Sequence, residues 1–281
     1  MPADHLTSPR TTDAPALAVA LRATRQRTLG LIDAWQQARP TLQVPQLDTL
    51  NPPLWELGHV GWFQEWWIAR NAQRKLGIAC KPDHVRPDSC LGRADLFYDS
   101  SSVAHADRWQ LPLPDLDATL GYLQAVLEDT LALLSDAGAG DEDLYFWRLV
   151  LLHEAMHNEA SVYMAQSLGV PVPDALARRT PLPLPLPLPL TDAAPGSDQN
   201  LEVSLPDQHW HLGHVGGGFA FDNELAGHEV HIDACHIDLL PVSWARYLPF
   251  IEATGHRLPP HLKRGGQGGR EGGGKGGGKG W

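Results

Sequence analysis

A run of alternating proline and leucine, PLPLPLPLPL at residues 181–190, constrains the fold of this 281-residue chain more than any other feature. Proline lacks the backbone N–H that helix interiors and central strands need, so such a run favours an extended, polyproline-like spacer. We interpret residues 171–198 as a linker between domains rather than as a recognition motif for a proline-binding module. The chain is therefore expected to fold as two parts, one on each side of this linker.

Four segments before the linker repeat apolar residues at helical spacing. They are residues 16–38, 51–77, 115–138 and 141–168. Asn51 is the expected N-cap of the second helix, and the two prolines that follow it suit a first helical turn. Residues 80–114 show no clear period, and we expect an ordered loop that reaches toward a functional site. Four long amphipathic helices are typical of a four-helix bundle, here over residues 13–170.

The two ends of the chain and the part after the linker lack the long helical periodicity of the bundle segments. Residues 1–12 are polar and are expected to be a frayed leader. Short alternating segments with Gly and Asp-Asn turns, such as residues 230–233, predict strands, and residues 243–254 predict one helix. We therefore expect an α+β domain over residues 199–262. Residues 263–281 are rich in glycine and are expected not to fold.

Composition excludes several classes of protein. The formal net charge of -11 argues against nucleic acid or an anionic membrane as the main partner. No stretch approaches the ~20 apolar residues of a membrane span, and the first residues lack the layout of a signal peptide. Three cysteines are too few and too scattered for a disulfide framework or a cysteine-type zinc site. A reducing cytoplasm is the expected location.

Two histidines, His153 and His157, lie four residues apart in LLHEAMHNEA on the expected fourth helix. This spacing places both imidazoles on one helix face. Neutral imidazoles suit Fe, Zn, Ni or Cu, but two ligands do not hold a metal securely. The best candidate for a third ligand is His59 in LWELGHVGWF, which lies amid apolar and aromatic residues of the second helix. Facing helices are the usual source of ligands for metal sites in bundle cores.

The same ten residues contain H-E-x-x-H, the zinc motif of metallopeptidases, in which the glutamate acts as a base. No sheet precedes the motif and no further histidine follows it closely, so peptide hydrolysis is disfavoured. Glu154 is offset by about 100° from the histidine face and is expected to be a solvated or rim residue. Glu159 lies about 200° around the helix from His157, which suits a second-shell or interhelical partner.

Three stretches together resemble the non-heme iron sulfoxide synthases of ergothioneine-type biosynthesis. They are NPPLWELGHVGWFQEWW, HEAMHNE and GGFAFDNELAGHEVHIDACHID, and the resemblance covers residues 15–262. In that family a DinB-like four-helix bundle is joined to a C-type-lectin-like domain of the formylglycine-generating enzyme, or sulfatase-modifying-factor, type. The resemblance implies an α+β multidomain protein with Fe²⁺ bound by His59, His153 and His157. It also implies that Glu159 is the motif glutamate, and that Trp62 and Phe63 form an aromatic wall beside the iron.

The reaction implied by this resemblance joins sulfur or selenium to C2 of the imidazole of hercynine, with O₂ as co-substrate. Three histidine ligands leave three positions for O₂, a soft donor and an imidazole. The stretch DLFYDSSSVAHADRWQLPLPD is poor in Arg and is more similar to the selenoneine synthase branch, whose donor is a selenosugar. Tyr98 and Asp99 in it are then expected to contact substrate. A thiol donor, cysteine or γ-glutamylcysteine, stays open, and Met156 stands where thiol-using members usually have Gln.

The chain departs from the family pattern after His261, where the family has its late catalytic residues. We therefore expect an incomplete lectin-like domain and impaired turnover, and the catalytic residues stay unassigned. Two alternatives remain: a DinB-like metal-dependent thiol transferase, which would lack the F-D-N-E motif at residues 221–224, and an inactive remnant that only binds metal. Other candidates are interpreted structurally: Trp55, Trp66 and Trp67 as bundle core, and His209, His211, His214, His228, His231 and His236 as strand-surface or turn residues. Oligomeric state is not predicted.

Overall fold

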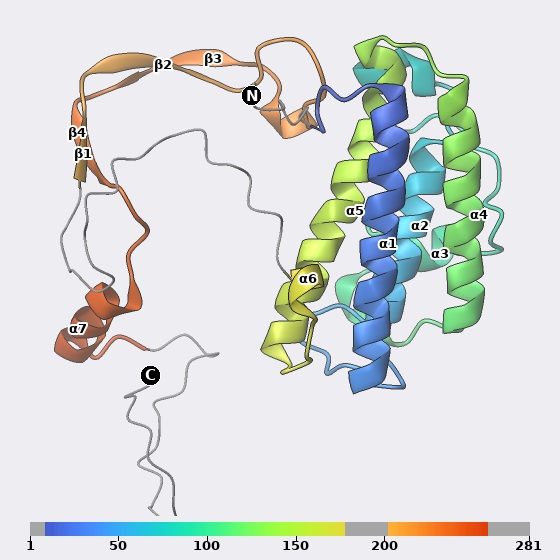
Figure 1. The fold of residues 1–281 in the computed structure, drawn as a ribbon, viewed down its shortest axis with the longest axis horizontal. Coiled ribbons are helices and arrows are strands. Elements are labelled where there is room, and N and C mark those ends of the chain that lie inside the picture. Colours follow the sequence, from blue (N-terminus) through green and yellow to red (C-terminus); the bar gives the residue numbers. More distant parts are fainter. Residues whose placement is uncertain (1–8, 178–201, 258–281) are drawn as a thin grey trace, which may run out of the picture. The chain divides into compact units, whose positions relative to one another are not determined.

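A computed structural model describes residues 9–177 and 202–257 of the chain (Figure 1). These residues form two compact units, and the boundary between them differs from the predicted one. The first unit contains residues 9–177 together with residues 213–228, and the second contains residues 202–212 and 229–257. Residues 178–198 of the predicted linker and the whole predicted tail, residues 263–281, lie outside the described residues.

Four long helices of the first unit lie side by side (Figure 1). They are α1 (Ala14–Ala38), α2 (Pro53–Trp67), α4 (Leu116–Ser135) and α5 (Asp141–Ser167). Aspartates begin two of them, because the side chain of Asp13 accepts from the amide of Ala16 and that of Asp115 from the amide of Ala118. The predicted four-helix bundle is confirmed, and three of its helices lie close to the predicted bounds.

Helix α2 is shorter than predicted at its C-terminal end. It ends at Trp67 rather than at residue 77, and a 3₁₀ helix, η1 (Arg74–Ala79), follows. The side-chain oxygen of buried Asn71 accepts from the amide of Gln73, which offers the backbone an alternative to helical hydrogen bonding. The N-cap prediction was also wrong: Pro52 holds that position without a side-chain hydrogen bond, and Asn51 donates to Glu56 instead.

The predicted loop between the second and third long helices is ordered. It contains two short helices, α3 (Ala94–Tyr98) and η2 (His105–Trp109). The indole N–H of Trp55 on α2 donates to the carbonyl of Phe97, and the imidazole of His59 donates to the carbonyl of Tyr98. The loop is therefore fastened to the face of α2 that carries the predicted metal ligand, as expected.

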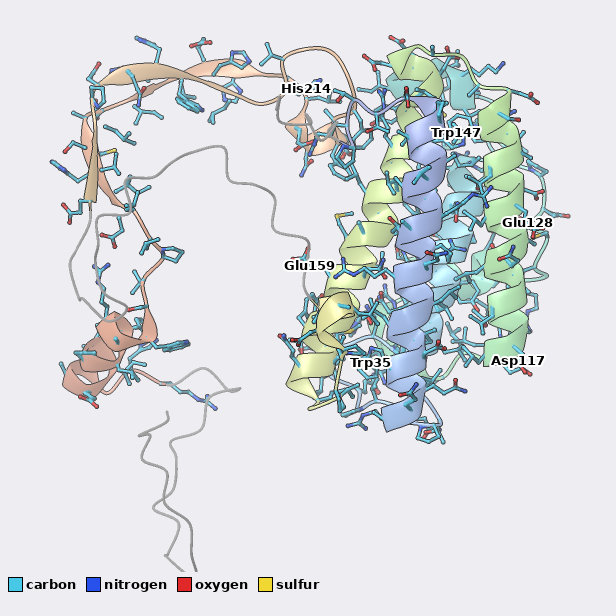
Figure 2. All side chains as sticks on the ribbon, in the orientation of Figure 1. Trp35, Asp117, Glu128, Trp147, Glu159 and His214 are labelled. Atoms are coloured by element: carbon cyan, nitrogen blue, oxygen red, sulfur yellow. The ribbon has the colours of Figure 1, made fainter. Side chains whose placement is uncertain are left out.

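Tryptophans fill much of the bundle core. Trp55 is buried as predicted, and so are Trp35 and Trp147, which Figure 2 labels. Trp66 and Trp67 are only half-buried. The guanidinium of Arg86 lies over both of their rings, so these two tryptophans form the wall of the bundle rather than its centre.

Residues 213–228 pack against the bundle, although they were predicted to belong to the second domain. Phe219 in this segment is fully buried, and the hydroxyl of Tyr145 on α5 donates to the carbonyl of Ala220. Arg10 forms a two-pronged ion pair with Glu224, with N–O distances of 2.6 and 2.9 Å. The prediction of a frayed leader is therefore wrong for the residues around Arg10, because a long-range ion pair holds them.

The segment approaches the bundle closely at Gly218. Its φ is +73°, and a Cβ there would lie 2.6 Å from the carbonyl oxygen of Arg10, so only glycine fits. Its amide donates to the carboxylate of Asp141 at the start of α5. Arg148 binds the same carboxylate and also donates to the carbonyl of Thr12, which is buried.

The second unit contains two two-stranded sheets and one helix. Strand β1 (Glu202–Leu205) pairs antiparallel with β4 (Cys235–Asp238), and β2 (Gln208–Leu212) pairs with β3 (His228–Ile232). Helix α7 (Trp244–Thr254) begins at Ser243, whose side chain accepts from the amide of Arg246. A helical part followed by a small part with strands confirms the predicted α+β class. No helix in the described part of the chain is both long enough and apolar enough to cross a membrane.

Candidate metal centre

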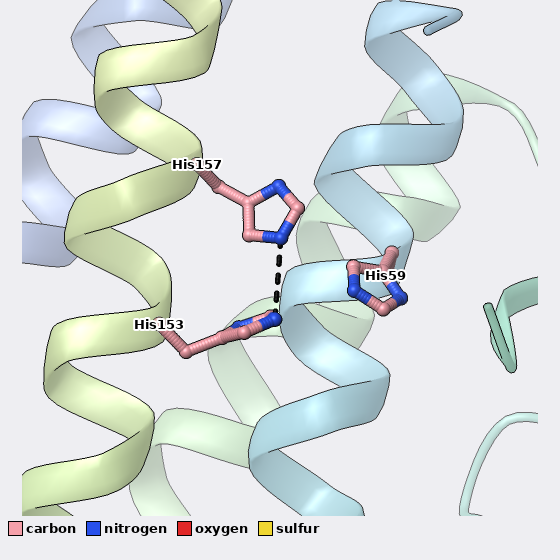
Figure 3. A group of neighbouring side chains, drawn as sticks. All are labelled: His59, His153 and His157. Carbon is pink, nitrogen blue, oxygen red and sulfur yellow. Dashed lines mark hydrogen bonds between the residues drawn. The ribbon is translucent and has the colours of Figure 1, made fainter. Parts of the chain in front are cut away.

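Three histidines from two facing helices meet inside the bundle (Figure 3). His59 comes from α2, and His153 and His157 come from successive turns of α5. One ring nitrogen from each lies within 4.8 Å of the other two. The structure therefore brings together the three histidines that the sequence predicted as metal ligands.

Hydrogen bonds orient two of the three imidazoles. The carbonyl of Tyr98 and the carboxylate of Glu56 can only accept, so His59 and His157 must donate to them from Nδ1. This tautomer leaves Nε2 of each ring unprotonated and turned toward the other histidines, the arrangement in which an outer partner fixes a metal-binding histidine. Glycine at position 58 allows the contact with Tyr98, because a Cβ there would overlap the tyrosine ring.

The electrostatics of the cluster favour the neutral form of two of its imidazoles, those of His59 and His153. Burial and the neighbouring His157 lower the pKa of His59 to about 4. Burial and the two other histidines lower the pKa of His153 well below its usual 6.5. Burial alone would raise the pKa of Glu56, but the hydrogen bond and charge interaction with His157 outweigh it and the pKa is lowered. Neutral imidazoles are the form that binds a metal ion.

The donor set fits a first-row transition metal. Nε2 of His153 and Nε2 of His157 lie 3.2 Å apart. Two nitrogen ligands that are each about 2.1 Å from one ion lie about 3 Å apart when they meet at a right angle. Imidazole donors suit Fe, Zn, Ni and Cu, and three of them leave further coordination positions for small molecules.

Glu154 is not the solvated or rim residue that its helical position predicted. Its side chain is 3% exposed and forms a two-pronged ion pair with Arg25 on α1, with N–O distances of 2.8 and 3.1 Å. The hydroxyl of Thr28 also donates to it. Because α1 packs along α5, the glutamate points into the bundle and away from solvent. A carboxylate held in this way cannot act as the base of a peptidase.

Trp62 and Phe63, the predicted aromatic wall, both lie beside histidines of the cluster. Phe63 stacks on His153 at a centroid distance of 3.6 Å. The ring of Trp62 lies 5.9 Å from that of His59, and its N–H donates to Asp95.

The side chain of Tyr98 is fully buried, and that of Asp99 accepts from Ser101 and Ser102 in a turn. Neither side chain lines the cavity beside the metal centre, so the structure gives no support to substrate contact by them. Glu159, labelled in Figure 2, is exposed on α5 and does not belong to the histidine group.

A cavity of about 430 Å³ opens beside His153, and we call it the aromatic cavity. Five rings line it, together with His153, one carboxylate and several small or aliphatic residues. The rings are Phe63, Trp67, Tyr145, Phe146 and Phe221, and the carboxylate is Asp222.

Among these five rings and the carboxylate, only Phe63 was predicted as a site residue, and Trp67 was interpreted as bundle core. Tyr145 and Phe146 lie eight and seven residues before His153, so they share its face of α5. That spacing was the signal that could have identified them. Phe221 and Asp222 come from the F-D-N-E motif, and only the docking of this segment on the bundle places them at the cavity.

The histidines of the second unit are mostly at its surface. Asp207, His231 and Asp233 bring ligand atoms within 4.8 Å of one another, but all three are exposed. His211 pairs with Glu229, also at the surface. Exposed ion pairs of this kind contribute little to stability. Within the described residues, the buried metal-ligand group is the one in the bundle.

Comparison with known proteins gives two results. The model of the DinB superfamily matches residues 20–160, a range that contains all three histidines of the bundle. The chain is also similar to the hercynine oxygenase of Mycolicibacterium smegmatis, with 29% identity over 248 residues that cover 86% of this chain and 51% of the relative. The hercynine oxygenase of Mycobacterium tuberculosis is 29% identical over 246 residues, which cover 85% and 51%. The chain thus spans about half the length of the curated relatives it matches.

Proposed function

Because the chain belongs to the DinB superfamily, we propose that it binds Fe²⁺ through His59, His153 and His157 and serves the oxidation of hercynine. The reaction would form a bond from selenium or sulfur to C2 of the hercynine imidazole. The similarity to hercynine oxygenases supports the substrate, since these relatives align with most of this chain. The three proposed iron ligands all belong to the first unit.

The convergence of three imidazoles, two of them oriented by hydrogen bonds, is the observation that carries this proposal. Bound iron would supply one-electron and O₂ chemistry that side chains cannot perform. The chain's own residues would hold the site in shape: Glu56 and the Tyr98 carbonyl keep the ring nitrogens of two histidines turned inward. Phe63 covers one face of His153 and would exclude water from it.

We further propose a selenosugar rather than a thiol as the donor. The resemblance of residues 95–115 to the selenoneine synthase branch supports this choice. The one arginine among these residues, Arg108, is also engaged within the protein, because it donates to Asn51 and lies over the ring of Trp55. A guanidinium group held in this way does not offer the carboxylate grip that a cysteine-type donor needs.

The test uses the full chain loaded with Fe²⁺ without oxygen and then exposed to O₂ and hercynine. Oxygen uptake and product mass are measured with selenosugar or with γ-glutamylcysteine as donor. Consumption of hercynine with a selenium-containing product is the expected result, and His59→Ala should abolish it while exposed His236→Ala should not. Turnover with the thiol alone would reject the selenosugar, and thiol transfer without O₂ would favour a thiol transferase. Iron binding without any turnover would mark a metal-binding remnant.

A further inference from the structure

The aromatic cavity has an unusual lining for a space next to a metal centre. Its rings carry electron-rich faces, and His153 lies at its edge. Asp222 is the one carboxylate among the lining residues, and no Lys or Arg is among them. The cavity therefore combines aromatic surface with a single negative charge.

Contacts on both sides of Asp222 fix it at the cavity. Before it, the carbonyl of Ala220 accepts from Tyr145 and the amide of Phe221 donates to Glu224. After it, Glu224 is paired with Arg10. The segment is thus tied to the bundle on each side of the residue that faces the cavity.

The carboxylate of Asp222 has no cation beside it among the described residues. One of its oxygens accepts from the amide of Asn223, and it forms no ion pair with a described Lys, Arg or His. Arg86, whose guanidinium lies 5.0 Å from the ring centroid of Trp67, donates instead to the carbonyls of Trp66, Pro82 and His84. The charge of Asp222 is therefore open to a cationic ligand.

A quaternary ammonium group matches this lining better than other cations. It cannot donate hydrogen bonds, so it needs no acceptors beyond the few polar atoms of this mostly aromatic and aliphatic lining. Ring faces attract such a group most strongly where water is excluded, and aromatic cages are a recurrent way to bind it. A carboxylate at the edge adds charge complementarity without displacing the rings.

We propose that the aromatic cavity is a subsite for a quaternary ammonium group, bound by its aromatic rings and by the carboxylate of Asp222. Resting on the proposed function, the group is the trimethylammonium of hercynine, whose imidazole then lies on the His153 side of the cavity. The subsite distinguishes a trimethylated substrate from histidine itself, because a primary ammonium loses more hydration on entering an aromatic cage.

Two probes of the same shape test the subsite. Choline carries a quaternary nitrogen, and 3,3-dimethyl-1-butanol has a neutral carbon in its place. Calorimetric titration of the full chain, without added metal, should show choline binding about tenfold more tightly than the alcohol. Asp222→Asn should remove most of this preference, and it keeps an oxygen that can accept from Asn223. Phe221→Leu, which keeps apolar volume but removes a ring, should also reduce it. Asp129→Asn, the same change at an exposed site on α4, should leave it intact.

Equal affinity of the wild-type chain for the two probes would overturn the subsite, as would an unchanged preference in Asp222→Asn. Hercynine should then displace choline, and histidine should do so at least about tenfold less well. Failure of hercynine to displace choline would refute its assignment as the ligand. Neither probe contains an imidazole and no iron is present, so choline preference without hercynine turnover would retain the subsite and reject the proposed function.

Discussion

At the scale of single residues, two glutamates near the histidines have different tasks. Glu154 is paired with Arg25 between α1 and α5, whereas Glu56 accepts a hydrogen bond from His157. Arg25 also donates to the carbonyl of Leu123 on α4 and to Gln64 on α2, so its guanidinium connects all four helices. The first glutamate stabilises the bundle and the second orients His157, a proposed metal ligand.

Replacement of Glu154 by Ala should therefore destabilise the protein strongly. It leaves the buried Arg25 charge unpaired, and breaking such a pair typically costs about 3–5 kcal/mol of unfolding free energy. Chemical denaturation measures the loss, with Asp129→Asn on the surface of α4 as a control that should change stability little. A folded Glu154→Gln protein that binds metal normally, keeps its stability and loses only activity would instead give Glu154 a catalytic task.

Replacement of Glu56 by Gln should weaken metal binding while the bundle stays folded. The amide can still accept from His157, but it lacks the negative charge that strengthens this hydrogen bond, and loss of such outer partners typically lowers metal affinity about 10–100-fold. Competition with a chelator measures the affinity, and Glu128→Gln, an exposed glutamate on α4, is the matched control. Unchanged affinity in Glu56→Gln would show that the carboxylate does not orient His157 for the metal.

At the scale of elements, the docked segment from Gly218 to Glu224 links the start of α5 to the cavity. The amide of Gly218 donates to Asp141, and the carboxylate of Glu224 accepts from Arg10. Both partners lie far from the segment in sequence. Helix α2 stops early for a related reason, since Asn71 bonds to the backbone locally and Arg70 pairs with Asp95. These contacts, rather than helical propensity, decide where elements end and what covers the cavity.

The docking of this segment should depend on pH. The hydrogen bond from Arg10, with the amide of Phe221, lowers the pKa of Glu224 below its usual 4.5. Arg148 and the amide of Gly218 lower that of Asp141 below 3.8. Lowered carboxyl pKa values in the folded state mean that the stabilisation is present above about pH 4.5 and is lost as the pH falls through the folded values.

Hydrogen exchange of the amides of residues 218–224 measures this effect. Protection should be constant near neutral pH and should fall below about pH 4.5, after correction for intrinsic exchange rates. Arg10→Ala should lower protection already at pH 7. Equal protection at pH 7 and pH 3 in the wild-type chain would show that these ion pairs do not hold the segment.

At the scale of the whole molecule, the sequence predicted the bundle, and it named the three histidines that lie together inside it. Apolar periodicity located the helices, and the i, i+4 spacing of His153 and His157 pointed to one face. The partners of Glu154 and Glu56 could not be predicted, because they lie on other helices and depend on how these rotate against one another. The position of Asp222 could not be predicted either. It depends on the packing of residues 213–228 against the bundle, from which they are far apart in sequence.

The iron content of the purified chain tests the central claim most directly. After anaerobic loading and removal of free metal, the wild-type protein should retain about one Fe²⁺ per chain, because three converging imidazoles hold one ion. His59→Ala and His153→Ala should each lose it while circular dichroism shows an intact bundle, and exposed His236→Ala should retain it. Retention of stoichiometric iron by folded His59→Ala and His153→Ala proteins would contradict the assignment of the metal centre.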